Sequence, residues 1–160
     1  GVTLPVPSGV PYNLLIFLYQ VASTTNGGAF NSGAWRTVPL NLEVVDTGGD
    51  GSIAGNTVTL AAGTYRASWR VVGRAVDKFQ SRLYTVSTTS VIEYGSNEMA
   101  PASDAAQSYS QGEARFTVSA GQQIRLEAQC QTTDLTGFGA ANSFGGPETY
   151  SSLTLIKEAP

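Results

Sequence analysis

The chain has 160 residues, of which 13% are charged, and its formal net charge at pH 7 is −3. This length is typical of a single folded domain, and so small a negative charge leaves no basic surface for nucleic acid. The 18 glycines and the few charges are typical of a turn-rich β protein rather than a disordered chain. No apolar run approaches the length of a membrane-spanning helix, so we expect no insertion into a membrane.

The first eleven residues, GVTLPVPSGVP, contain three prolines. Proline fixes its own backbone and keeps the preceding residue out of the helical region, so this segment favours an extended chain. The sequence therefore predicts a leader or linker over residues 1–11, followed by one domain over residues 12–160.

Residues 12–21, YNLLIFLYQV, form the first predicted strand and are apolar on both faces. An ordinary antiparallel strand buries one face and leaves the other in water. The second face therefore needs a partner, and another copy of the same chain is the simplest one. The last predicted strand, residues 150–156, is also apolar on both faces, so the chain is expected to form an oligomer.

Between these two segments, alternating patterns separated by Gly-, Asn- and Asp-rich turns predict further strands. The predicted strands are residues 57–60, 64–72, 78–86, 91–94, 112–119 and 123–131. Because proline cannot donate a backbone hydrogen bond, Pro39 predicts that residues 35–45 form an edge strand or a bulged strand. Residues 23–33, 95–110 and 132–148 are predicted loops. No segment has a helical period, and eight to ten strands of this kind indicate a two-sheet sandwich or jelly roll.

Several short motifs together resemble one family. Residues 62–65, AGTY, open an aromatic strand, residues 116–126 read FTVSAGQQIRL, and the Gly-Phe-Gly loop 137–139 precedes a hydrophobic closing strand. This order resembles the TNF and complement globular-head jelly roll from about Tyr12 onwards. The version that it resembles most is found on bacteriophage tail-fibre and tail-needle heads.

The resemblance implies an all-β, two-sheet antiparallel jelly roll of about ten strands, assembled as a homotrimer. In this family the first and last strands lie at the trimer axis. The side chains expected at the trimer interface are Leu14, Ile16, Leu18, Leu153 and Leu155.

Charged residues on two further strands are candidates for a ligand site. If residues 64–72 and 123–131 share the axial sheet, their charged side chains face neighbouring subunits or a bound anion. Those side chains are Arg66, Arg70, Arg125 and Glu127. For Arg66 and Arg70, the alternative is a structural arginine seam paired to Glu127 or Asp77.

The residue inventory argues against catalysis. The chain has no histidine, which excludes Ser-His-Asp triads and histidine-ligated metals. Cys130 lies on the apolar face of its strand and is expected to be a small core residue. The acidic residues specify no glycosidase pair. Asp46 and Asp50, in DTGGDG, lack the spacing of a calcium loop and favour a hairpin turn. We therefore expect no enzyme activity, metal or cofactor.

Aromatic residues offer a possible binding surface. Trp69 alternates with apolar residues and is expected in the core, whereas Trp35 follows a flexible loop and is a candidate for ligand binding. Phe138 and Phe144 lie in a Gly-rich loop and either stack on a sugar or tuck under the loop, and we expect at least one to be buried. Phe138 is a further candidate for ligand binding.

By resemblance, the function is a head at the tip of a phage tail fibre or needle, on the virion, that attaches to the host surface without catalysis. The expected partners are two further copies of the chain, a host-cell receptor such as a glycan, and other virion proteins. The alternatives are a capsid-decorating head-fibre trimer, a carbohydrate-binding β-sandwich module, and a secreted complement-type head, although no collagen-like repeat is present.

Overall fold

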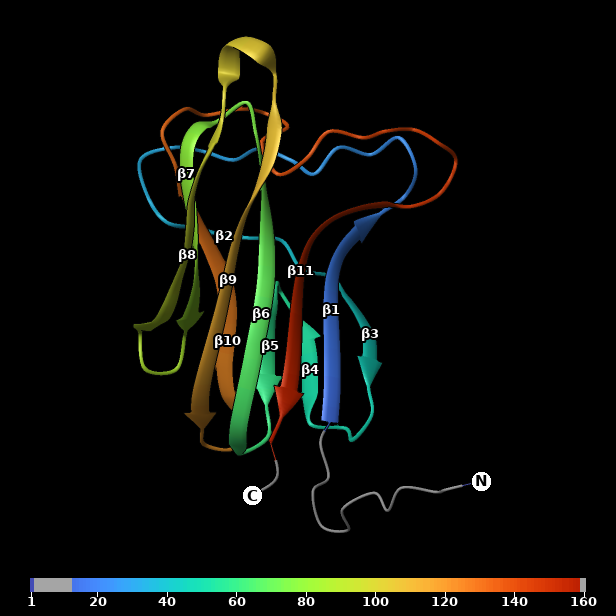
Figure 1. Cartoon of the computed structure of the whole chain (residues 1–160), viewed down its shortest axis with the longest axis vertical. Helices are drawn as coiled ribbons and strands as arrows, with labels where there is room; N and C mark the ends of the chain where they lie inside the picture. The colour runs from blue at the N-terminus through green and yellow to red at the C-terminus, as the bar shows by residue number, and fades with distance from the viewer. Residues whose placement is uncertain (2–12, 159–160) are drawn as a thin grey trace.

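The computed structural model describes Gly1 and residues 13–158, so most of the predicted leader over residues 1–11 lies outside the described residues. The described chain forms eleven strands and one short 3-10 helix (Figure 1). The elements are β1 (Asn13–Val21), β2 (Arg36–Thr37), β3 (Leu42–Asp46), β4 (Gly51–Ala54), β5 (Thr57–Leu60), β6 (Gly63–Arg74), β7 (Asp77–Thr85), β8 (Ser90–Ala100), η1 (Ala102–Asp104), β9 (Gln107–Val118), β10 (Gln122–Cys130) and β11 (Glu148–Lys157).

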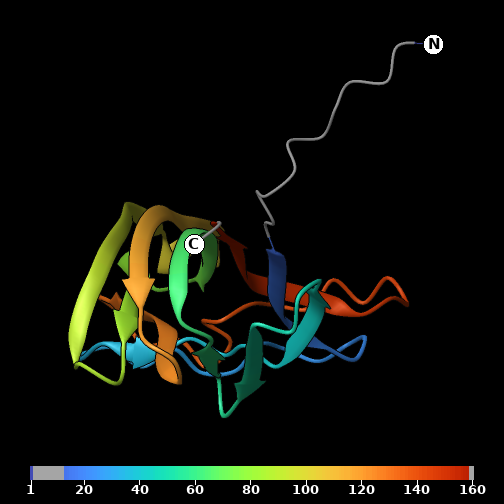
Figure 2. The ribbon, with the colours of Figure 1, turned by 90° about the horizontal axis from the view of Figure 1, so that it is seen from below.

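The strands form two antiparallel sheets that face each other, as the view from below shows (Figure 2). One sheet has the order β3-β1-β11-β6-β9, and the other has the order β4-β5-β10-β7-β8 with β2 paired to β10. The predicted two-sheet antiparallel jelly roll is confirmed. Because β1 pairs with β11 from Asn13 opposite Lys157, the first strand begins at the end of the molecule where the last strand finishes.

The core fills the space between the sheets with side chains that alternate along each strand. Tyr65 and Trp69 of β6 point inward from one sheet, and Leu83 and Leu126 point inward from the other, and all four are almost fully buried. Each such side chain contributes about 1.5–3 kcal/mol by leaving water. Trp69 therefore lies in the core, as the alternation predicted.

A chain of hydrogen bonds ties the two sheets together inside this core. The indole N–H of Trp69 donates to the Ser81 hydroxyl at 2.9 Å, and the hydroxyls of Ser81 and Ser110 lie 2.7 Å apart. Ser110 also donates to the backbone carbonyl of Ser96 at 2.7 Å. Since each polar group has a partner, the network stabilises the sheet contact rather than weakening the core.

The prediction that Leu153 and Leu155 form a trimer interface is wrong. Both side chains are fully buried within one chain, where Leu155 lies opposite Leu15 and Leu153 lies opposite Phe17. Side chains alternate along a strand, so the outward face of β11 carries the other set of residues, namely Ser152, Thr154 and Ile156. β1, in contrast, carries large apolar side chains on both of its faces.

The predicted long loop over residues 95–110 is also wrong. β8 and β9 extend through most of it and leave only residues 101–106, with η1, as the connection. β8 is the edge strand of its sheet and buries few side chains, so its sequence lacks the apolar alternation that reveals a strand. The prediction of one edge or bulged strand over residues 35–45 is wrong, because Pro39 lies in a break between β2 and β3, which belong to different sheets.

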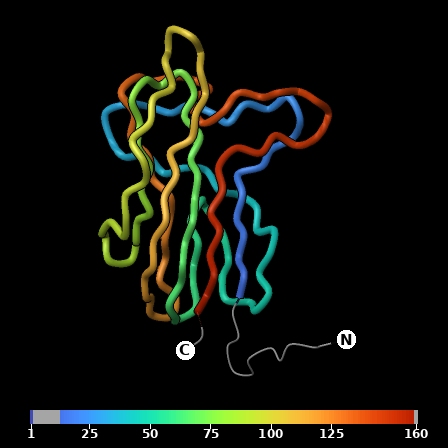
Figure 3. Tube along the Cα trace, viewed as in Figure 1, coloured from blue at the N-terminus to red at the C-terminus, as the bar shows by residue number. Residues whose placement is uncertain are grey.

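Two long loops run side by side away from the sheets as an arm, made by residues 22–29 and 139–147 (Figure 3). The backbone N–H of Gly27 donates to the carbonyl of Gly139 at 2.8 Å. The Glu148 carboxylate accepts backbone N–H groups from both loops, first those of Asn142 and Ser143 and then that of Thr24. These bonds hold the pKa of Glu148 below its ordinary value, although partial burial acts in the opposite direction.

The core position of Leu155 predicts a large stability loss on truncation. We expect Leu155→Ala to lower the free energy of unfolding by about 2–5 kcal/mol, because it leaves a cavity between the sheets. The matched control is Leu135→Ala, since Leu135 is 80% exposed, and its effect should stay within about 0.5 kcal/mol. Urea denaturation measures both, and equal effects would contradict the assignment of Leu155 to the core.

Candidate functional site

An apolar stripe crosses the outward face of the five-stranded sheet at the β1 side. Leu14, Ile16 and Leu18 point outward from β1 and are half-buried. Ile156 lies opposite Leu14 and is 40% exposed, and Leu42 lies opposite Leu18 and is 38% exposed. These five residues are called the apolar stripe below. In a single chain this apolar surface is exposed to water. Contiguous exposed apolar surfaces are typical of sites that bind another molecule.

Charged residues border the stripe on β6 and β9. Arg66 and Arg115 lie opposite each other in the register, and both donate to Glu158, with Nε to Oε1 distances of 2.9 Å and 2.8 Å. These hydrogen bonds, the one from Arg115 first, lower the pKa of Glu158 to about 2. Between this pair and the stripe, the surface is hollowed over the small side chains of Ser68 and Thr154.

The structure separates the predicted ligand residues. Arg66 and Arg70 lie in the five-stranded sheet, whereas Arg125 and Glu127 lie in the other sheet, so the condition under which all four would face one neighbour or one anion is not met. Arg70 covers the ring of Tyr109 at 4.8 Å. Both strands alternate equally well, and alternation alone does not say which sheet a strand joins.

Arg125 and Glu127 belong to an Arg–aromatic cluster on the outward face of the six-stranded sheet. Glu127 is 3% exposed. Its Oε1 accepts from Nη2 of Arg82 and its Oε2 accepts from Nη2 of Arg125, both at 2.6 Å. Trp35 covers Arg82 at 4.1 Å, and Tyr84 lies 5.0 Å from Arg82 and 5.3 Å from Arg125. These five residues form the cluster.

The predicted alternative, a seam in which Arg66 and Arg70 pair with Glu127 or Asp77, is wrong. Arg66 instead binds Glu158, and Arg70 lies over the ring of Tyr109. Asp77 accepts from the backbone N–H of Ala102 and from the Thr132 hydroxyl. Sequence reasoning missed Arg82 as a partner of Glu127, although the alternation of residues 78–86 placed it on the outward face. Because the guanidinium groups of Arg82 and Arg125 already bind Glu127, the cluster is a structural support for Trp35.

The aromatic residues of the Gly-rich loop differ in burial. Phe138 is buried and stacks on Phe30, with ring centroids 4.4 Å apart. Phe144 is 90% exposed. At least one of the two is therefore buried, as predicted, but Phe138 is the buried one, so its assignment as a ligand-binding residue is wrong.

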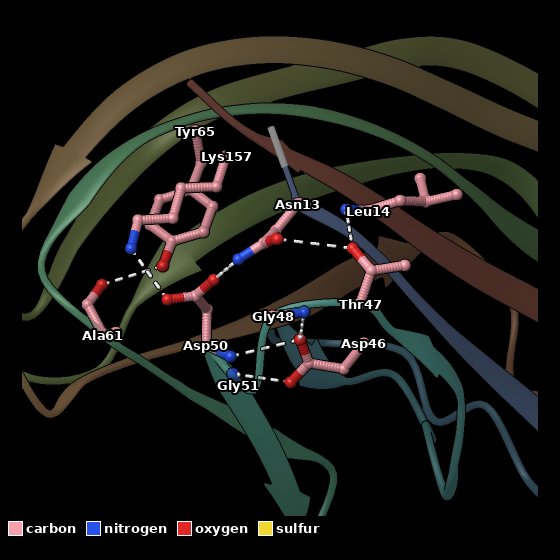
Figure 4. A network of polar contacts seen from close by, with 10 residues as sticks. All are labelled: Asn13, Leu14, Asp46, Thr47, Gly48, Asp50, Gly51, Ala61, Tyr65 and Lys157. Atoms are coloured by element: carbon pink, nitrogen blue, oxygen red, sulfur yellow. Dashed lines mark hydrogen bonds and ion pairs between the residues drawn. The ribbon is translucent and has the colours of Figure 1, made fainter. Parts of the chain in front are cut away.

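The acidic turn DTGGDG is held by a network of hydrogen bonds and one ion pair (Figure 4). Asp46 accepts the backbone N–H groups of Asp50 at 3.1 Å and Gly51 at 2.9 Å. Asp50 accepts from the Asn13 amide and, at 2.7 Å, from Nζ of Lys157. The described part of the chain contains no group of three or more Asp, Glu, Cys or His residues able to hold a metal.

Cys130 is a core residue, in agreement with its place in the alternation. It is 6% exposed, and its thiol donates to the backbone carbonyl of Thr132 at 3.3 Å. Burial raises the pKa of Cys130 to about 11. The thiol is therefore protonated at neutral pH and is a poor nucleophile.

Within residues 13–158, no helix combines the length and the hydropathy needed to cross a membrane.

No protein-family model matches the chain, and no curated protein matches its sequence. Solved structures do match. Murine APRIL at pH 5.0 is 12% identical, over 92% of this chain and 99% of APRIL, with a TM-score of 0.60. The globular domain of zebrafish complement 1qA is 12% identical, over 91% and 94%, with a TM-score of 0.54. Vertex protein P5 of the phage PRD1 is 14% identical, over 92% and 96%, with a TM-score of 0.54. The chain therefore has a TNF- and complement-head-like jelly-roll fold.

The buried Glu127 predicts a strong effect of removing its charge. We expect Glu127→Gln to lower the free energy of unfolding by about 3–5 kcal/mol, because it leaves two neighbouring guanidinium groups without their shared carboxylate. The control is Glu93→Gln on the exposed strand β8, which should change stability by less than about 0.5 kcal/mol. Denaturant unfolding of both variants checks this. A neutral Glu127→Gln variant would contradict the buried ion cluster.

The Asp46 turn predicts a specific acid sensitivity. Partial burial opposes ionisation, but the backbone N–H donors outweigh it and hold the pKa of Asp46 below its ordinary value of 3.8. The ionised carboxylate therefore stabilises the fold above pH 3.8, and this stabilisation is lost as the pH falls through the lower folded-state pKa. We expect Asp46→Asn to melt at a lower temperature than the wild type near neutral pH, and the difference to shrink in strong acid.

Thermal melts at several pH values measure this difference. Asp104→Asn, in η1, is the control and should follow the wild type throughout. A gap between Asp46→Asn and the wild type that is independent of pH would show that the carboxylate charge is not responsible.

Proposed function

We propose that the chain is the head of a homotrimeric virion fibre or needle, which attaches the particle to a host-cell surface by binding and without catalysis. In this proposal, residues 1–11 are the leader and residues 12–160 are the head. The observation that carries the proposal is the apolar stripe, because a closed sandwich has no need of a second apolar surface.

The stripe supports self-association in particular. It lies on β1 and β11, the strands that the family resemblance assigns to the trimer axis. It continues into the exposed edge strand β3, where Leu42 and Val44 are accessible. The bordering Arg66, Arg115 and Glu158 give a neighbouring copy charges to pair with. In a trimer, each copy would make the same contact with the next copy, and the ring of three contacts would cover the apolar stripe of every copy.

The direction of the strands supports an attachment function. β1 begins and β11 ends at one end of the molecule, and residues 22–35, 101–106 and 131–147 gather at the opposite end (Figures 1 and 3). Leu135 and Phe144 in the last of these loops are 80% and 90% exposed. If a shaft joins the head at the end where β1 begins, the loops at the opposite end point toward the host.

A position at a capsid vertex is the second candidate, and the likeness to the PRD1 vertex protein favours it. Both candidates use the same trimer. Antibody labelling of particles distinguishes them, because label at the tail tip supports the fibre head and label at the vertices supports the capsid location. A carbohydrate-binding module is instead expected to be a monomer.

The trimer proposal predicts that a charge in the stripe separates the subunits without unfolding them. Ile16 points outward, so Ile16→Asp should leave the core intact while placing a carboxylate in the interface. Light scattering on a size-exclusion column should give about three times 16.7 kDa for the wild type and one chain for the variant, with unchanged circular dichroism.

Ser90→Asp, on the exposed edge of the other sheet, is the control and should keep the wild-type mass. A monomeric wild type, or a trimeric Ile16→Asp variant, would refute the interface. Labelled trimer should also bind host cells with an apparent affinity about 10²-fold or more above that of the monomeric variant, because three sites act together.

A further inference from the structure

We propose that the outward face of the six-stranded sheet holds a binding site for a neutral saccharide, in a cleft beside Trp35. The inference deepens the proposed attachment function and rests on it for its biological meaning. It does not depend on the trimer, because one chain supplies every residue of the cleft.

The cleft has a volume of 640 Å³ and lies over β7, β8 and β10, with Trp35 at its side. Three carboxamide side chains lie in register across its floor, since Gln129 is opposite Gln80 and Gln80 is opposite Asn97. These three residues are called the amide row. A volume of this size is within the usual range of small-ligand sites, which is about 300–1,000 Å³.

The amide row has hydrogen-bonding capacity that the protein does not use. Gln80 donates from Nε2 to the backbone carbonyl of Gly95 at 3.0 Å, which leaves its side-chain oxygen available. Gln129 is half-buried and Asn97 is exposed, and within residues 13–158 their side-chain amides have no protein partner. The row therefore presents several donors and acceptors to a ligand.

The chemistry of the amide row selects the ligand class. A carboxamide offers a donor and an acceptor side by side, which matches a sugar hydroxyl because a hydroxyl also donates and accepts. An anion needs donors alone and a metal cation needs acceptors alone. Lys78 and Glu98, which line the cleft as well, carry opposite charges. The cleft is thus suited to an uncharged ligand with many hydroxyl groups.

The aromatic residues beside the row complete a sugar-binding arrangement. Trp35 is held in place by Arg82, which lies 4.1 Å from its ring and is fixed in turn by Glu127. Tyr94 is 50% exposed and its ring lies 6.0 Å from that of Trp35. A fixed ring edged by polar groups offers an apolar surface for the C–H face of a pyranose while the amides bind its hydroxyls.

The location also leaves the cleft accessible in the proposed assembly. The apolar stripe lies on the five-stranded sheet and the cleft lies on the outward face of the other sheet. Three copies joined through the stripe would therefore each keep an open cleft. Weak binding at each one would add up to firm attachment to a surface of repeated sugars.

Titration of ¹⁵N-labelled protein with neutral oligosaccharides tests the inference directly. The probes are gluco-, galacto-, manno- and N-acetylglucosamine oligomers, followed through the side-chain amide signals of Gln80, Gln129 and Asn97 and the indole signal of Trp35. We expect at least one probe to shift these signals in a saturable way, while the indole of the buried Trp69 stays unchanged.

Variants then locate the site. Trp35→Ala and Gln129→Ala should each weaken binding tenfold or more, whereas Tyr109→Ala, which removes an exposed ring from the other sheet, should bind like the wild type. Backbone spectra that match the wild type outside the cleft show that each variant is folded. Because Trp35 is itself a member of the Arg–aromatic cluster and its loss uncovers Arg82, Gln129→Ala is the decisive variant.

Three results would overturn the inference. The first is no saturable shift with any neutral oligomer, and the second is shifts that map to the loop of residues 133–147 instead of the cleft. The third is binding only of sulfated or sialylated sugars, with loss on Arg125→Ala. The outcome is independent of the proposed function. If the trimer binds cells but no neutral sugar binds the cleft, only this inference fails. If sugar binds a chain that is monomeric, the trimeric head fails and the cleft remains.

Discussion

The antiparallel pairing of β1 with β11 places Leu15 opposite Leu155 and Phe17 opposite Leu153 at the centre of the core. These residues come from opposite ends of the chain, so the sandwich closes only when its two ends meet. Contacts of such long sequence separation are slow to form and are costly to lose. The same pairing turns the outward residues of both strands into one continuous surface. The core and the apolar stripe therefore depend on a single register, and a slip of one residue would exchange them.

The two sheets differ in the character of their outward faces. The five-stranded sheet carries the apolar stripe and an exposed Arg66–Glu158 pair, which suits contact with a second chain. The six-stranded sheet carries aromatic rings, amides and a buried carboxylate, which suits a small polar ligand. In the proposed function, this division would keep assembly and recognition on opposite sides of one core. The outward apolar residues of β1 follow from its sequence, whereas a shared site for Arg66 and Glu127 required β6 and β10 to lie in one sheet, and they do not.

The sequence predicts the fold class because alternation and turn residues act locally, and the burial of Trp69 and Cys130 follows from the same alternation. Prediction from the sequence fails where the contact that fixes a side chain joins residues far apart in the chain. The pairing of Arg66 with Glu158 joins residues far apart in the chain, and the sheet to which β10 belongs depends on partners rather than on its own pattern. The sequence does not show which residues of β11 point outward, because large apolar residues occur on both of its faces. It also does not show that Phe138 is buried, because a Gly-rich loop has no periodicity from which burial can be predicted.

The direction of β1 has a mechanical consequence. Its first residue lies at the end where a shaft would join, and the loops that would meet a host lie at the other end. Tension between particle and cell would therefore act along the length of β1. The inter-strand hydrogen bonds of an antiparallel pair are perpendicular to the strands, so such a force would load the bonds between β1 and its neighbours together rather than one after another. Strands loaded in shear resist rupture better than strands that are peeled apart, and this geometry suits a protein that holds a particle against flow.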